Sequence, residues 1–232
     1  MIKQITEAEI DENLGKLIDG CIDNDVEMVK EAILEGADAN ILVEEAQGSP
    51  IHIAVLEGSL EALEVILEDS GNVNLQQQEG YTPLHHAISV QDAEMVEFLM
   101  TFDADPKITA DDSYNAFHLA ASIGSAEVLD TLQYYEDGVD STIEGGYSLL
   151  HLAAQYNNVE NIELLLDLEI DVNILADNKA TALHTAAESG QVDAVEMLLE
   201  KGINKDAQMD GGKTALDLAK EYEMEEVVGI LS

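Results

Sequence analysis

Apolar residues recur along this chain at spacings of three and four, the pattern of helices with one buried face. The helical runs come in pairs. A short run such as Leu149–Ala154 ends in two adjacent alanines, and a longer run such as Ile162–Leu166 follows after a tight turn. We therefore expect an all-α chain in which each pair consists of a short helix, a turn, a longer helix and a loop.

The pairs follow a strict period. His52, His85, His118, His151 and His184 are each 33 residues apart, and the next step reaches Asp217. A fixed period between about 20 and 50 residues indicates a stacked repeat array. We expect a single domain over 1–232, with its end units acting as caps and with units at about 6–40, 41–74, 75–107, 108–140, 141–173, 174–206 and 207–232.

Local signals place the starts of the helices. Proline or alanine two residues before the histidine suits a first helical turn, where a backbone N–H has no partner. Thr6 and Glu9 have the spacing of a capping box and predict a helix start near the N-terminus.

The segment Gly80-Tyr81-Thr82-Pro83-Leu84-His85, the Leu-Leu pairs and the ending Asp171-Val172-Asn173 resemble the ankyrin-repeat family. This resemblance covers nearly the whole chain and implies an ankyrin-repeat solenoid of stacked helix-turn-helix units joined by hairpin loops. The fourth unit departs from the pattern, with Asn115 and Ala116 in place of Thr-Pro and Gln133 at an apolar position. We expect that unit to be the least well packed.

The charge changes the picture of possible partners. The formal net charge is −40, and all nine basic residues are lysines. Such a surface should repel nucleic acid and anionic lipid and attract basic proteins. The alternative is that the acidity only provides solubility or suits a salty habitat.

Targeting signals and membrane spans are not evident. The N-terminus has no apolar stretch of signal-peptide length, and no window approaches 18 apolar residues. We expect a cytoplasmic monomer without membrane contact, although an exported protein whose signal has been removed would look the same. Cys21 is the only cysteine, so no internal disulfide forms.

The candidate motifs for catalysis, cofactor binding and metal binding are all incomplete. Histidines one per layer of packed helices would be about 8–10 Å apart, whereas zinc needs ligands about 2 Å from the ion. Gly211-Gly212-Lys213-Thr214 lacks the glycine that a phosphate loop needs, since Ala207 stands there. No stretch supplies a calcium loop. We expect no catalytic residue, no cofactor and no metal.

The resemblance also implies which side chains line the concave face and meet a partner. Tyr81, Tyr114 and Tyr147 occupy one position in three successive units, between acidic hairpin tips. Tyrosine is favoured at binding hot spots; the alternative is that these rings pack under the hairpins and stiffen the stack. The expected partner-binding residues are Ile53, Leu56, Glu79, Tyr81, His86, Val90, Asp111, Asp112, Tyr114, Leu119, Ile123, Glu144, Tyr147, Leu152 and Tyr156.

These observations predict a non-catalytic module that binds a basic protein partner on its concave face. By analogy with stand-alone ankyrin proteins of bacteria, it acts as an inhibitor or immunity protein of an enzyme or toxin. The alternatives are a general scaffold, a secreted effector engaging a host protein, and an acidic mimic of nucleic acid.

Overall fold

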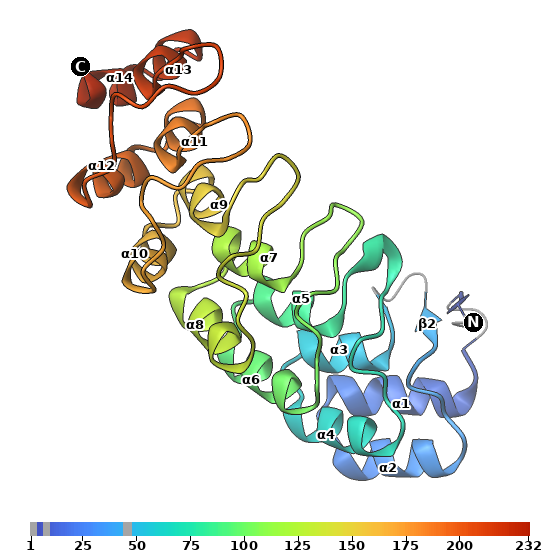
Figure 1. The fold of residues 1–232 in the computed structure, drawn as a ribbon. Coiled ribbons are helices and arrows are strands. Elements are labelled where there is room, and N and C mark those ends of the chain that lie inside the picture. Colours follow the sequence, from blue (N-terminus) through green and yellow to red (C-terminus); the bar gives the residue numbers. More distant parts are fainter. Residues whose placement is uncertain (1–3, 7–9, 44–47) are drawn as a thin grey trace. The chain divides into compact units, whose positions relative to one another are not determined.

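The computed structural model describes residues 4–6, 10–43 and 48–232. The chain divides into two compact units, Met1–Ala116 (unit 1) and Phe117–Ser232 (unit 2), and each is considered by itself. As predicted, the fold is built from helices (Figure 1).

The helices come in successive pairs of a first and a second helix, separated by tight turns. Unit 1 holds α1 (Glu12–Ile22), α2 (Val26–Leu34), α3 (Pro50–Leu56), α4 (Leu60–Asp69), α5 (Pro83–Ser89) and α6 (Ala93–Thr101), and α7 (Ala116–Ile123) begins at its last residue. Unit 2 continues with α8 (Ala126–Tyr135), α9 (Leu149–Gln155), α10 (Val159–Asp167), α11 (Ala182–Glu188), α12 (Val192–Glu200), α13 (Ala215–Glu221) and α14 (Glu225–Leu231).

First helices pack on first helices, and second helices on second helices. In unit 1, α3 lies between α1 and α5, and α2 packs against α4. In unit 2, α11 lies between α9 and α13, and α12 lies between α10 and α14. A two-helix pair cannot bury its own apolar face, so the core forms between neighbouring pairs. Small buried residues such as Ala153, Ala186 and Ala187 let the first helices approach closely.

Four of the periodic histidines cap the starts of first helices, namely α3, α5, α9 and α11. In α9, Nδ1 of His151 lies 3.2 Å from the backbone nitrogen of Ser148 and 2.8 Å from its Oγ atom. The same capping box joins Ser49 to His52, Thr82 to His85 and Thr181 to His184. Because Nδ1 accepts the backbone N–H, the imidazole is neutral with its proton on Nε2.

In unit 2 the second ring nitrogen reaches the next repeat. Nε2 of His151 lies 3.0 Å from the carbonyl oxygen of Ala180, and Nε2 of His184 lies 3.2 Å from that of Lys213. His151 and His184 thus each bond to the backbone of the following repeat. In the last pair, Asp217 accepts from the backbone and hydroxyl of Thr214, which holds the pKa of its carboxyl below the ordinary value.

Acid is expected to destabilise the protein through His52. Burial, with a smaller contribution from His86, lowers the pKa of His52 to about 3. The unfolded value is about 6.5, so as the pH falls from 6.5 toward 3 the unfolded chain binds a proton that the folded chain does not, and stability is lost. At pH 5 this loss is about 2 kcal/mol.

Denaturant unfolding of the wild type and of His52→Gln, each at neutral pH and at pH 5, measures this effect. Glutamine keeps an acceptor for the Ser49 N–H but does not titrate. The loss on acidification is therefore expected to be about 2 kcal/mol smaller in the variant. Repulsion among carboxylates affects both proteins and cancels, so equal losses would show that His52 is not a buried neutral histidine.

The N-terminal segment differs from its prediction. Helix α1 starts at Glu12, and its N-cap is Asp11, whose carboxylate accepts from the backbone nitrogen of Leu14. The helix start expected at Thr6 is therefore wrong for α1, and the capping box itself involves Glu9, which lies outside the described residues. Two short strands, β1 (Gln4–Ile5) and β2 (Leu42–Val43), pair in parallel beside α1. Two-residue strands are too short for period-two alternation to reveal them.

The fourth repeat contains a half-buried polar side chain, Gln133. Oε1 of Gln133 accepts from the backbone nitrogen of Gly138 at 3.3 Å, while its Nε2 atom is buried without a partner. That this repeat is the least well packed stays a prediction.

Candidate protein interface

Hairpin loops carry the acidic tips, and successive hairpins are bonded to one another. The backbone nitrogen of Asp111 donates to the carbonyl of Glu79 in unit 1, and Asp177 donates likewise to Gly145 in unit 2, both at 2.9 Å. Gly146 has a φ of 72°, and a Cβ there would lie 2.5 Å from Oδ1 of Asp177. Only glycine allows so close an approach.

The tips expose carboxylates to solvent. Glu79, Asp111, Asp112 and Glu144 are all exposed. Asp112 also has a structural role, because its carboxylate accepts from the Tyr81 hydroxyl at 2.9 Å and from the backbone nitrogen of Tyr114 at 2.9 Å.

The predicted tyrosines are half-buried and tied to the next hairpin. The Tyr81 ring stands edge-on to His85 with centroids 5.6 Å apart, in addition to its hydroxyl bond to Asp112. In unit 2, Tyr147 stands in the same way on His151, and its hydroxyl accepts from Asn178 at 2.9 Å. These contacts fit the stiffening alternative for both rings. Whether they also touch a partner stays a prediction.

His86 lies off the histidine period and packs between helices. Its ring centroid is 5.5 Å from that of His52 and 6.2 Å from that of Tyr81. Burial, assisted by the neighbouring His85, lowers its pKa to about 4. His86 is therefore neutral at physiological pH and only partly accessible.

Two of the predicted contact residues belong to the core. Ile53 is 8% exposed and Leu152 is 1% exposed, so neither has side-chain surface to offer a partner. Both directly follow a histidine, in the middle of a short first helix. Ile53 and Leu152 are therefore excluded from the candidate site. Leu56 and Leu119 are half-buried at its edge.

Four accessible apolar side chains share one position, five residues after the histidine or after Asp217, although Leu34, Tyr134 and Leu175 are more exposed elsewhere in the chain. Val90 is 48% exposed, Ile123 41%, Tyr156 49% and Tyr222 47%. This position is the C-terminal end of each first helix, where the packing surface stops. Tyr222 is not among the predicted contact residues, although the period of 33 leads directly to it.

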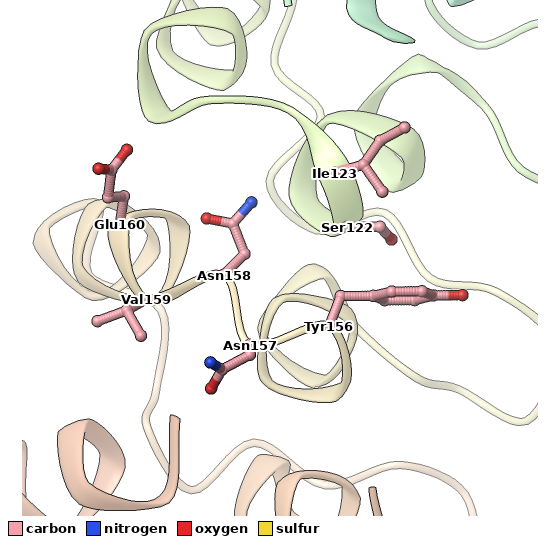
Figure 2. A pocket seen from close by; sticks show the side chains of 7 residues that line it. All are labelled: Ser122, Ile123, Tyr156, Asn157, Asn158, Val159 and Glu160. Carbon is pink, nitrogen blue, oxygen red and sulfur yellow. The ribbon is translucent and has the colours of Figure 1, made fainter. Parts of the chain in front are cut away.

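A cavity of about 530 Å³ opens at this position in unit 2 (Figure 2). Ser122, Ile123 and Tyr156 come from the ends of α7 and α9, and Figure 2 shows the Tyr156 ring extended below Ser122. The rest of the lining is Asn157, Asn158, Val159 and Glu160, from the following turn and the start of α10.

The turn that lines this cavity is held by amides. Nδ2 of Asn158 donates to the carbonyl of Gly124 at 2.7 Å, and Nδ2 of Asn157 donates to Asp193 at 2.9 Å. The fully buried Asn161 reinforces the turn by donating to the carbonyl of Ala120 at 2.8 Å. The cavity is thus framed by fixed backbone.

A second cavity in unit 2, of about 410 Å³, has an acidic and aromatic lining. Its residues are Ile143, Glu144, Tyr147, Gln155, Thr185, Glu188 and Ser189, from the hairpin and from the ends of α9 and α11. Gln155 and Tyr156 are neighbours in sequence, so this cavity and the one in Figure 2 lie on either side of the end of α9.

In the part of the chain that the structure describes, no group of three or more His, Cys, Asp or Glu side chains is arranged to hold a metal ion. The described helices are also too short or too polar to cross a membrane. Burial raises the pKa of the Cys21 thiol to about 12, so it is protonated and unreactive.

Comparison with known proteins identifies the repeat. The family model described as ankyrin repeats (3 copies) matches residues 17–112, 89–176 and 169–232. The human ASB11 ankyrin repeat domain is similar at 25% identity and a TM-score of 0.75, over 93% of this chain and 97% of that one. The ankyrin repeat domain of Bcl-3, described as a unique member of the IkappaB protein family, has 19% identity and a TM-score of 0.75, over 92% and 97%. A search of curated proteins finds no match.

Proposed function

Because this chain belongs to the ankyrin-repeat family, whose members are in general non-catalytic protein-interaction modules, we propose that it binds a basic partner protein. The observation that carries the proposal is the set of exposed hairpin carboxylates, in the same repeats as the accessible apolar residues Val90, Ile123 and Tyr156. An apolar centre with a charged rim is the usual construction of a protein interface.

The negative charge of this protein indicates a partner with a positively charged surface. The net charge is −40, and hairpin cations are engaged in ion pairs: Lys179 lies 2.7 Å from Asp210, and Lys213 pairs with Glu221. The exposed tips therefore attract a positively charged surface, which raises the association rate at low salt. The apolar residues determine the lifetime of the complex. An inhibitor or immunity role stays a prediction.

Neutralising the tips tests this proposal. We expect Glu79→Gln, Asp111→Asn and Glu144→Gln together to weaken partner binding about tenfold and to flatten its salt dependence. Asp112 is left unchanged because it holds Tyr81 and Tyr114. The measurement is affinity capture from the native cell extract with identification by mass spectrometry, followed by titration of the purified partner at low and high salt.

The matched control removes three carboxylates from the second helices, through Glu64→Gln, Glu127→Gln and Glu196→Gln. These residues are exposed on α4, α8 and α12. The control changes the net charge equally and is expected to bind within about twofold of wild type. A neutral or acidic partner, or an equal loss in both variants, would overturn the proposal.

A further inference from the structure

We infer that unit 2 recognises a short feature of its partner in which a lysine or arginine stands next to an apolar side chain. The inference rests on the proposed function, since it specifies what part of a basic partner is read. Its basis is the two cavities on either side of the end of α9, which differ in chemistry.

The acidic cavity fits the cation. Glu144 enters its lining from the hairpin and Glu188 from the end of α11, with the half-buried ring of Tyr147 in the same lining. Carboxylates provide charge-assisted hydrogen bonds to an ammonium or guanidinium group, and a tyrosine face adds a cation–π contact. The volume of about 410 Å³ accommodates a long side chain.

The cations of this chain leave the cavity free for a partner. Among the described residues, none forms an ion pair with Glu144. Lys213 is close enough to Glu188 to feel its charge, but it pairs with Glu221. Glu188 lies close enough to the Tyr222 hydroxyl to raise the pKa of that phenol, and among the described residues it forms no ion pair.

The second cavity fits the apolar side chain. Ile123 and Tyr156 provide accessible carbon, and Val159 adds more from the start of α10 (Figure 2). The amides of Asn157 and Asn158 are already bonded within the unit, so they shape the cavity without demanding partner hydrogen bonds. Rigid aromatic and aliphatic pockets of this kind hold the anchors of protein interfaces.

The two cavities are close enough to form one site. Gln155 lines the first and Tyr156 the second, and the Cα atoms of consecutive residues are about 3.8 Å apart. Neighbouring residues of an extended partner segment point in opposite directions, so one enters each cavity. A wholly apolar segment would bury Glu144 and Glu188 without a counter-charge, which is costly.

The test is an NMR titration of the full-length, nitrogen-15-labelled protein with capped tetrapeptides. The probe is Gly-Lys-Leu-Gly, and the two matched peptides are Gly-Gln-Leu-Gly and Gly-Lys-Ser-Gly. We expect millimolar binding of the probe with shifts at Gln155, Tyr156 and Glu188, and about fivefold weaker binding of each matched peptide. Absence of shifts at these residues would overturn the inference.

Substitutions test the acidic cavity and the apolar cavity separately. The pair Glu144→Gln and Glu188→Gln is expected to weaken Gly-Lys-Leu-Gly about fivefold, and the charge-matched pair Glu127→Gln and Glu196→Gln less than twofold. Tyr156→Ser is expected to abolish the advantage of leucine over serine. Equal loss in both charge variants, or an unchanged leucine preference in Tyr156→Ser, would also overturn the inference.

The two proposals fail separately. A basic partner whose binding depends on Glu79, Asp111 and Glu144, together with peptides that show no selectivity, would leave the proposed function standing and remove this site. A captured partner without basic character would remove both.

Discussion

Replacing His151 with leucine is expected to lower the free energy of unfolding by about 3 kcal/mol. The ring is fully buried and joins the start of α9 to the next repeat through Ser148 and Ala180. Leucine fills the space but leaves the backbone N–H of Ser148 without its acceptor, at a cost of about 1–3 kcal/mol, and also removes the bond to the Ala180 carbonyl, which keeps its bond from the backbone nitrogen of Ala176. Urea denaturation monitored by far-UV circular dichroism measures the change.

The control is Asp217→Leu at the equivalent position of the last pair. Asp217 is exposed and bonds only within its own capping box, so its removal is expected to cost about 1 kcal/mol. A similar loss in both variants would mean that the cap matters and that the bond to the next repeat does not.

Gly138→Ala is the second large expected effect, a loss of about 3 kcal/mol from overpacking. A Cβ at Gly138 would lie 2.3 Å from Cε2 and Cζ of Phe117, whose side chain is fully buried. Thermal unfolding followed by circular dichroism, with denaturant titration for the free energy, gives the size of the loss.

A compensating variant and a control glycine make this prediction specific. Phe117→Leu removes the two nearest clashing atoms, Cε2 and Cζ, so the double variant should be more stable than the sum of the two single losses predicts. Gly229→Ala, in α14 with open space around it, is expected to stabilise by up to about 1 kcal/mol. Additive losses at Phe117 and Gly138 would contradict the steric explanation.

The repeat architecture was predictable because it depends on short-range patterns that recur. The period of 33 placed the histidines, and the residues before them placed the helix starts. The start of α1 was predicted incorrectly because Thr6 has the capping-box spacing to Glu9. The actual N-cap is Asp11, which directly precedes the helix. Spacing identifies candidates for a cap but does not rank them.

The candidate site was less predictable because accessibility depends on contacts between repeats. Leu152 and Tyr156 are four residues apart on one helix, yet the first is fully packed and the second stands at the helix end. The bonds of Tyr81 and Tyr147 to the next hairpin depend on how closely hairpins approach, which the sequence does not encode at any one position.

The histidine bond from one repeat to the next makes the folding of unit 2 depend on the order in which its repeats are synthesised. His151 finds its acceptor 29 residues further along, at Ala180, and His184 does the same at Lys213. On the ribosome, a repeat that has just emerged still lacks the carbonyl that completes it. Each of these two repeats is therefore completed only when its successor has left the exit tunnel.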